Sequence, residues 1–207
     1  MVPMIASVLK PSVTKLIHPI ARGLLRLGLT PNGMTVVGTI ATCVAALTLL
    51  PSGHLFLASW VITLTCLTDL LDGTMARIRA TGATKWGSFL DSTLDRISDA
   101  AIFLGLAMYL NQQNDSLLSV VLVGLASGFM VSYIRAKAES LGVACTVGIA
   151  ERTERLAIML LGVGFAGLGI SYVLAISQWL LAILGIITVG QRILVVRRAT
   201  KDVKRTL

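Results

Sequence analysis

Long apolar stretches alternate with short polar ones along most of the 207-residue chain. A helix that crosses the hydrocarbon layer of a bilayer needs roughly 20 predominantly apolar residues. Six stretches come close to that length, and turn-forming residues such as Pro51-Ser52-Gly53 separate them. The pattern predicts an all-α, polytopic membrane protein. Its six transmembrane helices are expected at about residues 34–50, 54–77, 85–110, 116–140, 151–169 and 172–198.

The segment before the first span has a different pattern. Between Ile17 and Leu29, basic residues including Arg22 and Arg26 fall on one side, and Leu and Ile fall on the other. This arrangement is typical of an amphipathic helix that lies at the membrane surface. We expect no cleaved signal peptide, because no long apolar run leads to a small-residue cleavage site. The expected organisation is a single membrane domain over residues 1–207, with a juxtamembrane segment at 1–30 and a six-helix core at 31–207.

The composition agrees with a membrane protein. Hydrophobic residues make up 55% of the chain, charged residues make up 14%, and the mean hydropathy is +0.84. A soluble domain typically carries about 25% charged residues. The composition therefore excludes a soluble domain, and it excludes a disordered chain for the same reason.

The net charge of +8 is distributed unevenly along the chain. Apart from Arg96, every Lys and Arg falls in the N-terminal segment, around the second-to-third or fourth-to-fifth connection, or near the C-terminus. Basic residues favour the cytoplasmic side of a membrane protein. We therefore expect a multi-pass protein of the cell membrane with both termini in the cytoplasm. No nucleic-acid partner is expected, because the basic residues are not interleaved with aromatic ones.

Half of the ten acidic residues are concentrated in the second and third spans. Placing an acidic side chain within an apolar membrane helix is unfavourable in free energy, so each of these residues is expected to have a structural or functional role. Asp69 and Asp72 are three residues apart and share a helix face, whereas Asp91, Asp95 and Asp99 follow one another at four-residue steps. A short connection makes the two helices antiparallel neighbours. We expect their carboxylates to converge near the cytoplasmic surface.

Converging carboxylates need a compensating charge. Oxygen ligands without His or Cys suit Mg²⁺ or Mn²⁺ better than zinc, and Mg²⁺ commonly serves phosphate-containing substrates. Gly73 and Gly87 leave space for a bulky group beside the carboxylates, and Arg77 can meet a phosphate. The structural alternative is a buried ion-pair network of these acids with Arg77 and Arg96.

The spacing of these residues resembles the signature of the CDP-alcohol phosphotransferases. The matching pattern is Asp69-x-x-Asp72-Gly73-x-x-Ala76-Arg77, then nine residues, then Gly87-x-x-x-Asp91-x-x-x-Asp95. The resemblance implies a six-helix membrane enzyme, usually a homodimer. Such an enzyme transfers the phosphatidyl group of CDP-diacylglycerol to an alcohol and releases CMP.

The resemblance also implies roles for individual residues. Asp69, Asp72, Asp91 and Asp95 would hold two divalent ions, Mg²⁺ or alternatively Mn²⁺, and Asp95 would be the general base on the acceptor hydroxyl. Residues 30–35, Thr-Pro-Asn-Gly-Met-Thr, resemble the family element Thr-Pro-Asn-x-x-Thr, which closes over the nucleotide. The residues implied in binding CDP-diacylglycerol are Pro31, Asn32, Thr35, Asp69, Asp72, Gly73, Arg77, Thr84 and Gly87.

Polar residues in the second half of the chain bear on the acceptor alcohol. Converging guanidinium groups suit an acceptor that carries a phosphate. Residues 132–139 and 151–155 resemble the corresponding stretches of actinobacterial phosphatidylinositol-phosphate synthases, which use inositol 1-phosphate. The residues that this resemblance implies in binding the acceptor phosphate are Ser132, Arg135, Arg155 and Arg192, with Lys137 and Arg152 as weaker candidates.

Three alternatives stay open at this point. The acceptor could be glycerol 3-phosphate, which also needs basic residues. The basic residues could instead orient the protein and contact anionic lipid, and this is the favoured interpretation for Arg197, Arg198, Lys201, Lys204 and Arg205. A protein of another class, a cation transporter, could use the aspartates as its ion site.

Overall fold

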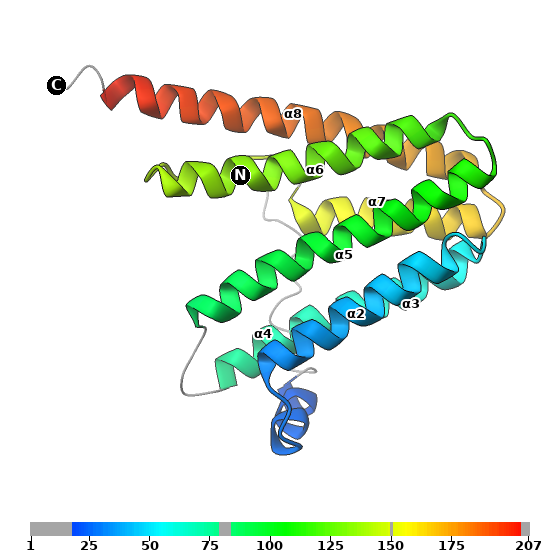
Figure 1. The fold of residues 1–207 in the computed structure, drawn as a ribbon, viewed down its shortest axis with the longest axis horizontal. Coiled ribbons are helices and arrows are strands. Elements are labelled where there is room, and N and C mark those ends of the chain that lie inside the picture. The colour runs from blue at the N-terminus through cyan, green and yellow to red at the C-terminus, as the bar shows by residue number, and fades with distance from the viewer. Residues whose placement is uncertain (1–17, 79–83, 150, 204–207) are drawn as a thin grey trace. The chain divides into compact units, whose positions relative to one another are not determined.

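The computed structural model describes residues 18–78, 84–149 and 151–203, with residues 69, 70, 202 and 203 described by their backbone alone. In this part of the chain the regular structure is helical and contains no β-strand, which confirms the predicted all-α class (Figure 1). The helices that follow residue 30 are α2 (Pro31–Leu49), α3 (Leu55–Cys66), α4 (Thr68–Ile78), α5 (Lys85–Gln112), α6 (Leu117–Ser140), α7 (Arg152–Gly167) and α8 (Tyr172–Val203).

The predicted amphipathic helix lies partly outside the described residues, which begin at residue 18. Residues 18–26 are helical, with Arg22 and Arg26 exposed and Ala21 fully buried. The helix ends in a Schellman motif: Gly28 has a φ of +83°, and the N–H of Leu29 donates to the carbonyl of Leu24 at 3.1 Å. The location of this helix at the membrane surface stays a prediction.

Four helical runs are long and apolar enough to cross a membrane. They are Pro31–Leu49, Leu55–Ile78, Leu117–Ser140 and Tyr172–Lys201. The other two predicted spans correspond to α5, which carries acidic residues in its first half, and to α7, which has 16 residues. The membrane character is supported, and the count of six spans stays a prediction.

The second predicted span is interrupted, whereas the sequence pattern predicts one continuous helix. α3 ends at Cys66 and α4 begins at Thr68. The hydroxyl of Thr68 donates to the carbonyl of Thr65 at 2.5 Å and so competes with the backbone hydrogen bonds at the break. α2 packs closely there, since a Cβ added at Gly38 would lie 2.1 Å from the Thr68 hydroxyl oxygen.

The chain divides into two compact units, each built from segments that are separate in the sequence. Unit 1 consists of Met1–Ala45 and Val61–Ala101, and unit 2 consists of Ala46–Trp60 and Ile102–Leu207. Unit 1 contains most of α2, all of α4 and the first half of α5. Unit 2 contains all of α6, α7 and α8. The single-domain organisation stays a prediction.

In unit 2, α8 packs against both α6 and α7. Small residues allow these close contacts. A Cβ added at Gly185 of α8 would lie 2.2 Å from the hydroxyl oxygen of Ser127 on α6, and one added at Gly162 of α7 would lie 1.9 Å from that of Ser177 on α8. Small residues at helix crossings let membrane helices pack by backbone proximity. This packing fixes the position of α8, which carries Arg192.

Candidate active site

The first predicted nucleotide-binding element forms the capped start of α2. The side-chain oxygen of Thr30 accepts a hydrogen bond from the N–H of Gly33 at 3.0 Å, and Pro31 is the first residue of the helix. Thr at the N-cap and Pro at the first helical position are both favoured, because they suit the unpaired N–H groups at a helix start. The element Thr-Pro-Asn therefore has a local structural role as well as the predicted binding role.

Thr35 connects this element to the acidic residues of α4. Its hydroxyl donates to Oδ2 of Asp72 at 2.6 Å, and its oxygen also lies 3.1 Å from the carbonyl oxygen of Pro31. Both residues are buried, with Thr35 6% and Asp72 7% exposed. A hydrogen bond from a hydroxyl to a buried carboxylate fixes the orientation of that carboxylate. The sequence indicated both residues but not this contact.

Gly73 and Arg77 share one face of α4. A Cβ added at Gly73 would lie 3.7 Å from an Nη atom of Arg77, and Arg77 itself is exposed. The guanidinium therefore lies over the glycine position, beside the turn that carries Asp72. This agrees with the predicted face on which a phosphate could meet Arg77.

The start of α5 repeats the arrangement at the start of α2. The side-chain oxygen of Thr84 accepts a hydrogen bond from the N–H of Gly87 at 2.9 Å. A Cβ added at Gly87 would lie 3.1 Å from both the Thr84 hydroxyl oxygen and the Asn32 amide oxygen. Gly87 thus lets the starts of α2 and α5 come close together. Thr84, predicted to bind the nucleotide, caps α5 in this structure.

The three aspartates of α5 occupy one unbroken helix, so their four-residue spacing places them on one stripe. Asp91 is exposed, and the side chain of Asp95 is 17% exposed. Nη1 of Arg96 lies 3.5 Å from Oδ2 of Asp95, which is a long ion pair. Asp95 is the more enclosed of the two predicted metal ligands on this helix.

The donor set suits a hard divalent cation, because it consists of carboxylates without His or Cys, and Asp72 is already oriented by a buried hydroxyl. In the part of the chain that is described, no group of three His, Cys, Asp or Glu side chains is close enough to hold a metal ion. The side chain of Asp69 lies outside that part. The convergence of the four carboxylates stays a prediction.

In unit 2, Arg192 is the most enclosed of the predicted acceptor ligands, with 5% exposure. Its Nε donates to the carbonyl of Val147 at 2.9 Å, and its Nη1 donates to the carbonyl of Val131 at 2.5 Å. The guanidinium thus joins α8 to α6 and to the loop before α7. Val131 directly precedes Ser132, so the structure brings two predicted acceptor residues into one region.

The remaining predicted acceptor residues are more accessible. Arg135 donates from Nε to Oε1 of Glu139 at 2.9 Å, and these two side chains are 52% and 54% exposed. The hydroxyl of Ser132 donates to the carbonyl of Gly128 at 3.2 Å within α6. Arg155 is half-buried on α7, as is the weaker candidate Arg152, and Lys137 is exposed on α6.

Residues 28–190 match the family model CDP-alcohol phosphatidyltransferase. The chain belongs to this family. The match covers the capped start of α2, the acidic helices and Arg155, which confirms the family predicted from the spacing of the aspartates. Membership of this family also excludes the alternative that the protein is a cation transporter.

Curated relatives are similar over most of their length. One is a phosphatidylinositol phosphate synthase of Mycobacteroides abscessus, 40% identical over 191 residues, which are 91% of this chain and 86% of the relative. Another is a phosphatidylinositol phosphate synthase of Streptomyces avermitilis, 41% identical over an alignment of 198 residues that covers 91% of this chain and 81% of the relative. The predicted resemblance to actinobacterial phosphatidylinositol-phosphate synthases is confirmed.

Solved structures show the same likeness in three dimensions. The phosphatidylinositol phosphate synthase of Mycobacterium tuberculosis with CDP-DAG bound superposes with a TM-score of 0.83 at 42% identity, over 88% of this chain and 94% of that chain. The same enzyme in complex with manganese and citrate gives a TM-score of 0.82 at 42% identity, over 87% of this chain and 88% of that chain. The fold of this chain is therefore similar to that of a solved phosphatidylinositol phosphate synthase.

Proposed function

We propose that the protein transfers the phosphatidyl group of CDP-diacylglycerol to inositol 1-phosphate, which gives phosphatidylinositol phosphate and CMP. The observation that carries this proposal is the likeness, at 42% identity and a TM-score of 0.83, to a phosphatidylinositol phosphate synthase solved with CDP-DAG bound. The Asp, Gly and Arg residues of the signature support it, because they supply the groups that a phosphoryl transfer at a membrane surface needs.

The nucleotide end of CDP-diacylglycerol is assigned to unit 1. Pro31, Asn32 and Thr35 at the start of α2 and Thr84 and Gly87 at the start of α5 form the CDP-binding set together with residues of α4. The α4 members are Asp69, Asp72, Gly73 and Arg77. The contact of Gly87 with Asn32 supports this grouping, since it keeps the two capped helix starts together. Arg77 provides a guanidinium for a phosphate oxygen.

Asp69, Asp72, Asp91 and Asp95 are assigned as ligands of two divalent ions, Mg²⁺ or alternatively Mn²⁺. When bound, such ions neutralise charge on the pyrophosphate and on the attacking oxygen. The hydroxyl of Thr35 holds the Asp72 carboxylate in one orientation. The solved relative with manganese supports a divalent metal.

Asp95 is assigned as the general base. Its carboxylate accepts the proton of the acceptor hydroxyl as the oxygen attacks the phosphorus that bears the diacylglycerol group. The bond from that phosphorus to the CMP oxygen breaks, and CMP leaves. The partial enclosure of Asp95, at 17% side-chain exposure, supports a base that is reached by the acceptor but shielded from bulk water.

The phosphate of the acceptor is assigned to Ser132, Arg135, Arg155 and Arg192. Arg192 supports this assignment best, because the backbone carbonyls of Val131 and Val147 hold its guanidinium in one place. A fixed guanidinium loses little side-chain entropy when it binds a phosphate. An acceptor without a phosphate would leave these basic residues without a substrate role.

We also propose that all six apolar stretches cross the cell membrane, with α5 and α7 as the third and fifth spans, and with both termini and the active site on the cytoplasmic side. The distribution of Lys and Arg supports this topology. A homodimer is the proposed assembly. Labelling of single introduced cysteines from each side of the membrane tests the topology, and light scattering of the purified protein tests the dimer.

The transfer itself is tested with purified protein, CDP-diacylglycerol and Mg²⁺, to which inositol 1-phosphate, glycerol 3-phosphate or free inositol is added, with CMP release as the measurement. Among the three acceptors, we expect rapid release of CMP only with inositol 1-phosphate. Release with glycerol 3-phosphate but not with inositol 1-phosphate would overturn the acceptor, and absence of release with every acceptor would overturn the transferase.

A further inference from the structure

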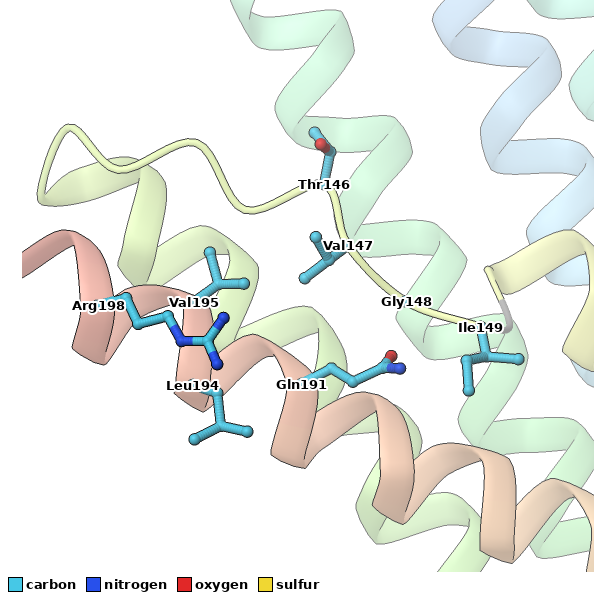
Figure 2. Close-up of a pocket in the computed structure, with 8 residues that line it drawn as sticks. All are labelled: Thr146, Val147, Gly148, Ile149, Gln191, Leu194, Val195 and Arg198. Atoms are coloured by element: carbon cyan, nitrogen blue, oxygen red, sulfur yellow. The ribbon is translucent and has the colours of Figure 1, made fainter. Parts of the chain in front are cut away.

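A groove of about 430 Å³ lies in unit 2 between the loop before α7 and the last turns of α8 (Figure 2). The loop supplies Thr146, Val147, Gly148 and Ile149, and α8 supplies Gln191, Leu194, Val195 and Arg198. The α8 positions are three or four residues apart, so they form one helix face. The volume is in the range of sites that bind small molecules.

Arg198 and Gln191 lie at the two ends of this groove, with Thr146 and apolar side chains along it. Figure 2 shows Arg198 at one end and Gln191 at the other, while the loop runs alongside. Arg198 is exposed and forms no ion pair with any described side chain, and Asp202 on the next turn is described by its backbone alone. Arg198 is the charged residue among those that line the groove.

The order of these groups along α8 matches the order of groups in a phospholipid. The apolar span that contains them ends at Lys201, so Arg198 lies close to the membrane boundary and Gln191 lies two turns deeper. Seven residues of helix correspond to about 10 Å. A lipid likewise has its phosphate at the boundary, its ester groups deeper, and its acyl chains beyond them. A bare phosphate ion is too small to contact both Arg198 and Gln191.

We propose that this groove binds an anionic membrane phospholipid. Arg198 pairs with the lipid phosphate, the amide nitrogen Nε2 of Gln191 donates to an ester carbonyl, and Val147, Ile149 and Leu194 contact the start of an acyl chain. Basic pockets at the ends of membrane helices are suited to anionic headgroups. The groove differs from the proposed acceptor site, because Arg192 points to the carbonyls of Val131 and Val147 and does not line it.

The test measures binding of dioleoyl phosphatidylglycerol to the full-length protein in a neutral detergent by native mass spectrometry. Two probes separate the parts of the ligand: dioleoylglycerol lacks the phosphate, and inorganic phosphate lacks the chains. Arg198→Gln is compared with Arg197→Gln, which removes the same charge from an exposed neighbour outside the groove. We expect the dissociation constant to rise about tenfold or more in Arg198→Gln and less than about twofold in Arg197→Gln.

Equal losses in the two variants would overturn the site, because they would show diffuse attraction to basic residues. Dioleoylglycerol bound as tightly as phosphatidylglycerol would also overturn it, as would inorganic phosphate that displaces the lipid at similar concentrations. CMP release by Arg198→Gln separates this proposal from the proposed function. We expect an unchanged KM for inositol 1-phosphate, and a tenfold increase would assign the groove to the acceptor site instead.

Discussion

In unit 1 the predicted site residues are held by contacts near helix starts, whereas in unit 2 the key basic residue is held by distant backbone groups. Thr30 and Thr84 cap the helices that carry the nucleotide-binding residues, each through an N–H three residues away. Arg192 instead donates to carbonyls that are 45 and 61 residues away in the sequence. Local motifs therefore specify the capped helix starts of the first site, while the position of Arg192 in the second site depends on helix packing.

The two regions also differ in how their charges are compensated. The Asp72 carboxylate is buried and accepts a hydrogen bond from Thr35, so a cation beside it would meet an oriented ligand. Both side chains of the Arg135–Glu139 ion pair are exposed, so this pair contributes little to the free energy of unfolding. We therefore expect substitutions in unit 1 to have the larger effects on catalysis, and substitutions in unit 2 to act on the acceptor.

The largest effect is expected from Asp95→Asn. The amide cannot accept the acceptor proton, so the rate of CMP release should fall by about a hundredfold to ten-thousandfold. Binding of CDP-diacylglycerol should stay within about threefold, because most of its ligands are unchanged. Asp99→Asn, one further step along the same stripe, is the matched control and should keep most of the activity. Loss of nucleotide binding in Asp95→Asn would show that Asp95 is mainly a ligand or a structural residue.

The next largest effect is expected from Thr35→Val, which removes the hydroxyl that orients Asp72. Loss of such a supporting hydrogen bond typically weakens metal binding or activity by about ten- to a hundredfold. The Mg²⁺ concentration for half-maximal CMP release should rise accordingly. Thr35→Ser keeps the hydroxyl and should have the Mg²⁺ requirement of the unchanged protein. An unchanged Mg²⁺ requirement in Thr35→Val would show that the contact with Asp72 does not support metal binding.

Arg192→Lys tests the packing-dependent site of unit 2. A lysine keeps the charge but has no planar fork, so it cannot donate to both Val131 and Val147 in the same way. The KM for inositol 1-phosphate should rise about tenfold, and the melting temperature should fall by about 3–12 °C, since a hydrogen bond from a charged group is worth about 1.5–3 kcal/mol. The control is Arg197→Lys. A lower melting temperature with an unchanged KM would make Arg192 purely structural.

The smallest effect is expected from Arg135→Gln. Loss of its exposed ion pair should change the free energy of unfolding by less than about 0.5 kcal/mol. If Arg135 binds the acceptor phosphate, the KM should rise about fivefold, as expected for one lost charge at the membrane surface. Glu139→Gln breaks the same ion pair and keeps the arginine, so its KM should stay unchanged. Equal KM values in the two variants would remove Arg135 from the acceptor set.

The apolar pattern was sufficient to predict most helices, because burial in lipid requires long apolar runs. It did not predict the break between α3 and α4, since that break depends on the Thr68 hydroxyl and on the close approach of α2 at Gly38. Gly73 and Arg77 are four residues apart, so helix periodicity alone places them on one helix face.

Other features of the site depend on contacts between separate segments. No local pattern indicates that Thr35 donates to Asp72 or that Arg192 binds the loop carbonyl of Val147. The groove lined by Ile149 and Arg198 likewise forms only when the loop lies against α8. Residue types and spacings indicated which chemistry to expect, and packing determined which groups orient the residues that perform it.

The most direct test offers the purified enzyme equal concentrations of inositol 1-phosphate and glycerol 3-phosphate with CDP-diacylglycerol and Mg²⁺, and identifies the lipid product by mass spectrometry. We predict phosphatidylinositol phosphate as the main product, formed in a one-to-one ratio with CMP. Phosphatidylglycerol phosphate as the main product would contradict the acceptor assignment, and CMP without a new phospholipid would contradict the transfer.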